Sequence, residues 1–113
     1  MPAWYWEKGL HDAIIKNITL CPLNYDYTQK NPIRNYLLIE IDSSHALFDS
    51  TIKEIKLFNA KILSEKNNYC GYWWVKDTLD IIDGKYILKI DVGYEKEKNT
   101  IIIKFDSAEV IRK

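Results

Sequence analysis

The clearest pattern of hydrophobic and polar positions lies in the last third of the chain. Asp83-Gly84 separates two runs in which apolar and polar residues alternate. Asp-Gly is a favoured pair for a type I′ turn, because both central residues of that turn need a positive φ. A two-residue turn pairs Ile82 with Lys85 and sets the register of both strands outward from that pair. The pattern therefore predicts a β-hairpin over residues 73–94.

This register separates an apolar face from a polar face, since side chains alternate across a strand. The pairs predicted on the apolar face are Ile81 with Tyr86, Leu79 with Leu88, Val75 with Val92, and Trp73 with Tyr94. The pairs predicted on the polar face are Ile82 with Lys85, Thr78 with Lys89, Lys76 with Asp91, and Trp74 with Gly93. Asp77 falls on the apolar face opposite Ile90. Trp73 is expected to be buried, and Trp74 to cover the exposed backbone of Gly93.

A third strand follows the hairpin. The charged run 95–98 predicts a four-residue loop, after which residues 100–106 alternate again. With that loop length the inward residues and their expected partners are Ile101 with Val92, Ile103 with Ile90, and Phe105 with Leu88. Lys104 and Asp106 then point outward. The last forty residues therefore predict a three-stranded antiparallel meander, and the tail 108–112 has the composition of a further short strand.

The first two-thirds of the chain carry weaker patterns. Residues 36–41 are rich in β-branched and aromatic residues and predict a strand covered on both faces at its start, ended by the turn-forming Asp-Ser-Ser at 42–44. Residues 52–62 fit either a helix or a strand. Residues 10–18 fit a helix lined by Leu10, Ile14 and Ile18, whereas residues 13–20 fit a first strand that ends before Pro22. We favour strands at both places.

About six or seven strands at this spacing predict a mainly β fold, an antiparallel sandwich or an open barrel. The alternative is an α+β fold with one helix over a sheet. A length of 113 residues fits one domain covering residues 1–113. The chain carries 16 Lys and Arg against 16 Asp and Glu, so it lacks the basic excess expected of a protein that binds nucleic acid or an anionic membrane.

No apolar run approaches the about 20 residues of a membrane span, and the first residues do not resemble a secretory signal. We therefore expect a cytoplasmic protein, and the many Ile, Lys and Asn residues suggest an AT-rich bacterial genome. In that compartment Cys21 and Cys70 are expected to be free thiols. Without a Cys-x-x-Cys pair, and with only two histidines, the sequence predicts no cofactor and no metal.

Several short motifs resemble those of a known group of proteins. Leu10-His11-Asp12-Ala13 is similar to the opening of small bacterial proteins, mostly uncharacterised, some of which are grouped with the immunity proteins of contact-dependent or polymorphic toxin systems. Trp73-Trp74-x-x-Asp77 and Tyr86-x-Leu88 resemble the later half of such proteins. The chain departs from them at Thr78, where they often carry Glu. The resemblance implies a protein that acts by binding, and it supplies no catalytic residue.

Aromatic residues are the first candidates for a site. Trp4, Tyr5, Trp6, Tyr72 and Trp74 together offer enough rings for a surface patch. Exposed aromatic clusters mark protein interfaces and also stack against sugars. The alternative is that most of these rings fill the core or its rim.

Three polar residues complete the candidate set. Asp77 on an apolar face must find hydrogen bonds, from backbone N–H groups or a tyrosine and in the neighbourhood of a β-bulge, or else it is a carboxyl held in a cleft with a shifted pKa. His11 and Asp12 are expected to bond to each other or to the backbone where the first strand begins. A catalytic role for His11 would require an acid that converges with it in a pocket.

The function predicted from these residues is binding, with another protein as the partner and an immunity-type interaction as the leading case. The alternative is a β module that binds a carbohydrate or small ligand through Trp74 and its neighbours. A hydrolase using His11 is the least favoured option. Neither nucleic acid nor membrane is expected as a partner, and association of the chain with itself stays open.

Overall fold

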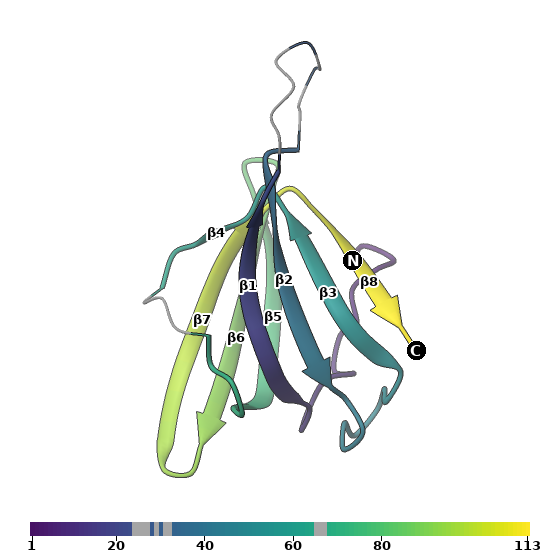
Figure 1. Cartoon of the computed structure of the whole chain (residues 1–113), viewed down its shortest axis with the longest axis vertical. Helices are drawn as coiled ribbons and strands as arrows, with labels where there is room; N and C mark the ends of the chain where they lie inside the picture. Colours follow the sequence, from purple (N-terminus) through teal and green to yellow (C-terminus); the bar gives the residue numbers. More distant parts are fainter. Residues whose placement is uncertain (24–27, 29, 31–32, 65–67) are drawn as a thin grey trace.

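The computed structural model describes residues 1–23, 28, 30, 33–64 and 68–113. These residues form one antiparallel sheet with the strand order β4-β7-β6-β5-β1-β2-β3-β8 (Figure 1). The strands are β1 (Ile14–Pro22), β2 (Asn35–Asp42), β3 (Ile52–Phe58), β4 (Lys61–Ile62), β5 (Trp73–Ile82), β6 (Lys85–Tyr94), β7 (Glu97–Phe105) and β8 (Ser107–Arg112). The described residues include no helix, and hence none that could span a membrane.

The sheet consists of two halves that are joined at one corner. β1, β2, β3 and β8 form one half, and β4, β7, β6 and β5 form the other. The only register pair between β1 and β5 is Ile14 with Trp73, so the two strands diverge beyond it and β5 passes behind β1 and β2 (Figure 1). The outermost strands β4 and β8 do not pair, so the sheet is open. The predicted mainly β, open antiparallel architecture is confirmed, and the helix alternative is wrong.

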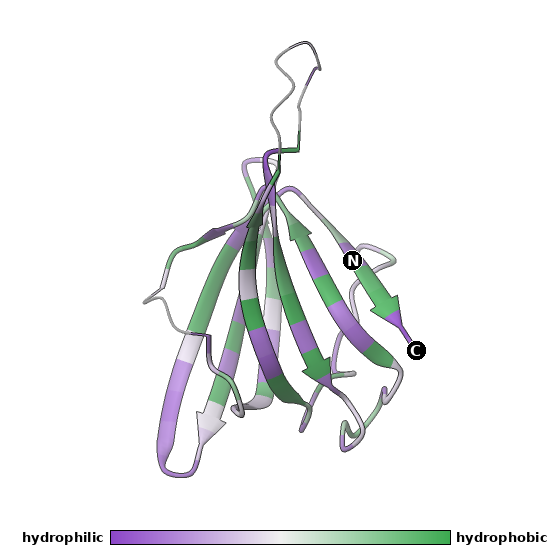
Figure 2. Cartoon of the chain, in the orientation of Figure 1, coloured by the Kyte–Doolittle hydropathy of each residue, from purple (hydrophilic) through white to green (hydrophobic). Residues whose placement is uncertain are grey.

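The core lies between the two halves, where the inward residues of each strand meet. In β2 these are Leu37, Ile39 and Ile41, and their neighbours in the sequence are only half-buried. The same alternation appears as bands along the strands when the chain is coloured by hydropathy (Figure 2). The further fully buried side chains include Leu10, Ile15, Ile52, Ile55, Leu57, Trp74, Leu88, Ile90, Ile101, Ile103 and Phe105.

The hairpin around Asp83-Gly84 has the predicted register over most of its length. Both turn residues have positive φ, 52° and 76°, as a type I′ turn requires. The predicted pairs are confirmed from Ile82 with Lys85 as far as Lys76 with Asp91. Beyond Lys76 an extra residue, Val75, forms a β-bulge, and Trp74 pairs with Val92 instead of Gly93.

The bulge reverses the predicted positions of the two tryptophans. Trp74 is fully buried, whereas Trp73 is 42% exposed and lies opposite Gly93. Val75 is 41% exposed, although alternation predicts it inside. The physical reason is that one additional residue in a strand moves every side chain beyond it to the other face. The predictions for Trp73, Trp74 and Val75 were therefore wrong.

The third strand of the meander begins earlier than predicted. Glu95 and Lys96 form a two-residue turn, Glu95 has a φ of 53°, and Tyr94 pairs with Glu97. The expected four-residue loop was wrong, and each inward residue of β7 pairs with a residue of β6 two positions earlier in the sequence than predicted: Ile101 with Ile90, Ile103 with Leu88, and Phe105 with Tyr86. A shift of two residues leaves every side chain on its face, so these three residues are still buried.

The remaining strand predictions are confirmed in outline. Residues 14–22 and 52–58 are strands, which settles both ambiguous segments, and β1 runs on to include Pro22. The tail forms β8, which pairs with β3. Asp42 caps the turn after β2 because its carboxylate accepts hydrogen bonds from the backbone N–H and hydroxyl of Ser44.

Candidate functional site

Asp77 on β5 is held by three side chains that donate hydrogen bonds. Its Oδ1 accepts from the Tyr5 hydroxyl, and its Oδ2 accepts from Trp6 Nε1 at 2.9 Å and from Trp74 Nε1 at 2.7 Å. Tyr5 and Trp6 belong to residues 1–13, called here the N-terminal strap. The expectation that Asp77 bonds to a tyrosine near a β-bulge is confirmed. The hydrogen bonds from Tyr5 and Trp6 to Asp77 thus hold the strap against β5.

The electrostatics of this cluster combine two opposing effects. Burial raises the pKa of Asp77, and the three hydrogen bonds from Tyr5, Trp6 and Trp74 lower it; burial prevails, so the pKa lies above its usual value. Burial also raises the pKa of the Tyr5 hydroxyl, and its hydrogen bond to Asp77 raises it further. All three donors are neutral groups, so the carboxylate is stabilised by hydrogen bonds and not by an ion pair.

The strap also contributes aromatic rings to the core. Trp6 meets Trp74 edge-on with ring centroids 5.7 Å apart, and Trp4 packs against Tyr86 at 5.4 Å and Phe105 at 5.8 Å. Trp6 and Trp74 are buried and Trp4 is half-buried. The predicted surface patch of aromatics is therefore wrong in its placement, and the alternative that they fill the core and its rim holds. The Trp6 and Trp74 rings can turn inward because both N–H groups donate to Asp77.

Tyr72 lies in a different aromatic group. Its ring meets Tyr69 at 5.1 Å and Tyr94 at 5.4 Å, and its hydroxyl donates to a carboxylate oxygen of Glu97. The structure therefore does not bring Tyr72 together with the strap tryptophans. It instead joins the segment before β5 to the turn between β6 and β7.

The tetrapeptide Leu10-His11-Asp12-Ala13 has a clear structural role at the bulge. Leu10 and Ala13 are fully buried. The Asp12 N–H donates to the Trp74 carbonyl at 2.9 Å, and the Trp74 N–H donates to the Ala13 carbonyl at 2.7 Å. His11 Nδ1 bonds to the Val75 carbonyl, while its Nε2 lies 3.8 Å from Asp12 Oδ2. The expected bonding of His11 and Asp12 to the backbone is confirmed, whereas their side chains are too far apart for a hydrogen bond.

A hollow of about 430 Å³ opens beside this bulge. Because Val75 is displaced outward, its side chain forms one wall, and Phe48 from the loop between β2 and β3 forms another. The lining residues are Glu7, Lys8, His11, Phe48, Val75, Lys76 and Asp77. The structure thus brings His11 and Asp77, which were candidates for separate reasons, to the walls of the same hollow.

Large apolar side chains are exposed around this hollow. Phe48 is 66% exposed and Leu47 is 60% exposed, and the Leu47 N–H donates to the His11 carbonyl at 2.8 Å. Val75 also lines a neighbouring hollow together with Trp73, so it lies between Phe48 in the first hollow and Trp73 in the second. We call Leu47, Phe48, Trp73 and Val75 the Val75 patch. Sequence reasoning missed Leu47 and Phe48, although an apolar pair in a turn-rich segment is a usable signal.

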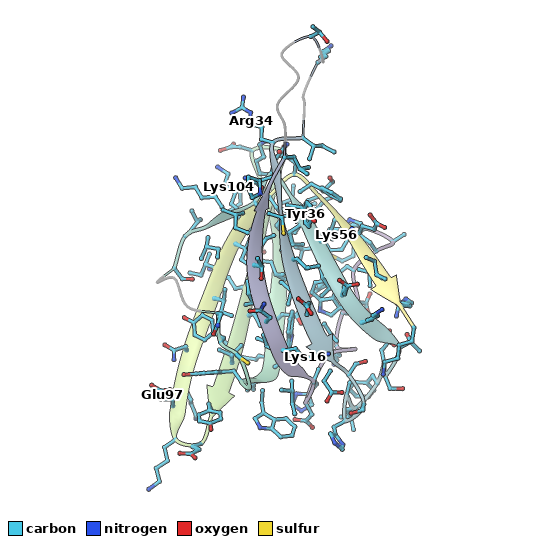
Figure 3. All side chains as sticks on the ribbon, in the orientation of Figure 1. Lys16, Arg34, Tyr36, Lys56, Glu97 and Lys104 are labelled. Carbon is cyan, nitrogen blue, oxygen red and sulfur yellow. The ribbon has the colours of Figure 1, made fainter. Side chains whose placement is uncertain are left out.

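The outer face of β2 and β3 carries a second group of aromatic residues, which is less exposed to solvent than the Val75 patch. Tyr36 packs against Phe58 with ring centroids 6.2 Å apart, and Lys56 Nζ lies 5.2 Å from the centre of the Tyr36 ring. Figure 3 shows Tyr36 and Lys56 on neighbouring strands of this face. All three side chains are half-buried, so they partly cover one another and expose less apolar surface than the Val75 patch.

Partners within the chain already engage Asp77 and His11, two of the polar side chains at the hollow. Its lining residues within the described chain include no hydroxyl or thiol nucleophile. Asp77 is occupied by three donors and His11 Nδ1 by a carbonyl. Among the residues that the structure describes, no group of three or more His, Cys, Asp and Glu could hold a metal ion, and both cysteines are free.

No protein-family model, curated protein or solved structure matches this chain.

Proposed function

We propose that this chain is a binding domain whose partner is another protein, and that the partner docks on the Val75 patch. The observation that carries the proposal is the group of exposed apolar side chains at two hollows that share Val75, one lined also by Phe48 and the other by Trp73. Burying such side chains provides most of the free energy of protein association. Leu47, Phe48, Trp73 and Val75 are between 41% and 66% exposed, so a partner can cover much of their surface.

The polar surroundings suit a protein interface. Glu7, Lys8 and Lys76 line the hollow together with Phe48 and Val75, so charges of both signs border an apolar centre. Interfaces commonly combine an apolar centre with a polar rim. The net charge of zero favours neither nucleic acid nor an anionic surface as the partner.

The two other candidate functions have less support. Sugar binding needs exposed indole rings, but Trp6 and Trp74 are buried with their N–H groups donated to Asp77, which leaves Trp73 as the exposed tryptophan of the group. A hydrolase using His11 would need that residue and an acid in one pocket, and His11 and Asp77 do share the hollow. Their existing hydrogen bonds favour a structural role over proton transfer.

The immunity-type interaction is the finer form of the proposal. It depends on the resemblance carried by Leu10-His11-Asp12-Ala13, and these residues support the wall of the hollow through the bulge. For an immunity protein the partner is a toxin, and the toxin is neutralised when it binds the Val75 patch.

The proposal is tested by placing the photo-crosslinking residue p-benzoylphenylalanine at position 48 and irradiating the protein in a lysate of its host. Phe48 is already an exposed aromatic residue, so the change is expected to leave the fold intact. The expected result is one recurrent protein adduct, and Val75→Glu is expected to abolish it, because a charge in an apolar contact must be desolvated.

The matched control is Leu63, which is 49% exposed and follows β4, an outermost strand of the sheet. The crosslinker at position 63 should give no such adduct, and Leu63→Glu should leave the adduct at position 48 unchanged. Equal labelling at both positions, or an adduct that survives Val75→Glu, would refute the proposed surface. Quenching of Trp73 fluorescence by a glycan would favour the carbohydrate alternative.

A further inference from the structure

The two halves of the sheet separate between β1 and β4, and a hollow of about 460 Å³ lies between these strands. β1 pairs with β2, β4 pairs with β7, and no register pair joins β1 to β4 among the described residues. We call this space the β1–β4 hollow. Its apolar lining residues are Ile18 and Leu20 of β1, Leu37 of β2, Ala60 before β4, and Ile62 of β4.

Three of these side chains lie on the core side of the sheet but are not covered by the core. Opposed residues of an antiparallel pair share a face, so a residue paired with a buried one points inward. Ile18 and Ile62 are nevertheless only half-buried, and Leu20 is 54% exposed. The hollow is therefore a part of the interior that these side chains leave unfilled. The pairs, each with a buried partner, are Ile18 with Ile39, Leu20 with Leu37, and Ile62 with Ile103.

The size and lining of the hollow fit a small apolar ligand. Pockets for small molecules measure about 300–1,000 Å³ and are lined mainly by apolar side chains with a few polar groups. Leu37 and Ala60 are buried, so the hollow reaches down to the core. An apolar chain placed there would remove the exposed surface of Leu20 from water, which is favourable.

The rim of the hollow is positively charged. Lys61 is exposed and is the only charged residue among the described residues that line it. Lys61 lies directly opposite Lys104 in the β4–β7 pair, and like charges in such a pair repel each other. Asp106, two residues after Lys104, already accepts hydrogen bonds from Lys85 and Asn59. An acidic group on the ligand would offset the repulsion between the two lysines.

We propose that the β1–β4 hollow binds a medium-chain fatty acid, with its chain between β1 and β4 and its carboxylate at Lys61 and Lys104. The chain covers the inward side chains of Ile18 and Leu20, and the carboxylate pairs with the ammonium groups. This inference is independent of the Val75 patch, because no residue of that patch lines the β1–β4 hollow.

The test titrates the protein with decanoate and follows the methyl groups of isoleucine and leucine by NMR. Chemical-shift changes are expected at Ile18, Leu20 and Ile62, and none at Leu47 of the Val75 patch. 1-Decanol, kept below its solubility limit, has the same chain without the charge and is expected to bind more weakly. This measurement uses the wild-type protein, so it does not depend on how any variant folds.

Two variants with matched controls locate the chain and the carboxylate. Leu20→Trp should abolish decanoate binding because the larger side chain occupies the hollow. Leu23→Trp should leave binding unchanged, since Leu23 is 42% exposed but does not line the hollow. Lys61→Gln should weaken decanoate binding about fivefold, the effect of one exposed ion pair, and leave decanol binding unchanged. Lys89→Gln, an exposed lysine of β6 outside the hollow, should change neither.

The site would be overturned if decanoate caused no shift at the three methyl-bearing residues, or if it shifted Leu47 equally. Binding that survives Leu20→Trp would also overturn it, because the ligand would then lie elsewhere. If decanol bound as tightly as decanoate and Lys61→Gln had no effect, the assignment to a carboxylate would be refuted. Shifts confined to the hollow, lost in Leu20→Trp and weakened in Lys61→Gln, would support the proposal.

Discussion

At the scale of single residues, Asp77 shows how one half-buried carboxylate can organise its surroundings. Three neutral donors from positions 5, 6 and 74 converge on it, and two of them are 71 and 72 residues away in the sequence. Each donor would be left without its acceptor if the carboxylate were removed. Because buried donors without partners are costly, Asp77 is expected to stabilise the position of the strap even though its own burial is unfavourable.

Replacing Asp77 by leucine should therefore destabilise the protein. We expect Asp77→Leu to lower the free energy of unfolding by about 2–4 kcal/mol, because each orphaned donor costs about 1–3 kcal/mol and the added apolar contact offsets part of that cost. Urea denaturation followed by circular dichroism measures the change. The control is Asp80→Leu, an exposed aspartate on the same strand, for which little change is expected.

The size of this effect should depend on pH. Burial raises the pKa of Asp77 in the folded chain above its unfolded value of about 3.9, so the folded state binds this proton more tightly. The stabilisation from that proton is complete below the unfolded pKa and is lost as the pH rises through the folded pKa. The difference between wild type and Asp77→Leu should thus widen as the pH falls from neutral. This account would be contradicted if the leucine variant were as stable as the wild type. It would also be contradicted if the difference in their free energies of unfolding became smaller as the pH falls.

At the scale of elements, the meander is determined mostly by local chemistry. The Asp83-Gly84 turn could be predicted because both positions need positive φ and the flanking residues alternate. The register followed correctly as far as Lys76. It failed at Val75 because a bulge depends on which side chains can be buried together, and Trp74 reaches Asp77 only when it faces inward.

The turn itself can be tested at Gly84. A Cβ there would meet no atom within 4 Å, so the cost of Gly84→Ala comes only from its φ of 76°. We expect a loss of about 1 kcal/mol in the free energy of unfolding, measured by urea denaturation.

Gly93→Ala is the matched control in the same hairpin. Its added Cβ would lie 3.5 Å from the Glu97 carbonyl oxygen, an ordinary contact, and Gly93 is not among the residues with positive φ. Alanine at position 93 should be neutral or slightly stabilising. If both variants lost the same free energy of unfolding, the positive φ at Gly84 would not be the cause of the loss.

At the scale of the whole molecule, the strap supplies a packing layer that the sheet lacks. The two halves of the sheet meet at one corner and leave β5 without a neighbouring strand over residues 77–81. Trp4 and Trp6 fill this region with aromatic rings that contact β5, β6 and β7. The strap is thus part of the core, although its sequence suggested a surface patch.

Truncating Trp6 should for this reason be far more costly than truncating Trp73. Trp6 is 7% exposed and Trp73 is 42% exposed. We expect Trp6→Ala to lower the free energy of unfolding by about 3–5 kcal/mol, and Trp73→Ala to have a much smaller effect. Chemical denaturation of both variants provides the comparison, and similar losses for the two would show that the strap is not part of the cooperative core.

Local patterns were enough to predict the β character of the chain, the hairpin centred on residues 83 and 84, and the inward position of Asp77. These features depend on turn chemistry and on alternation between near neighbours, which operate over a few residues. The folded chain was needed to find the bulge at Val75, the burial of Trp74 and the position of the strap. They depend on contacts between segments about seventy residues apart, where the best burial and hydrogen bonding outweigh a local pattern.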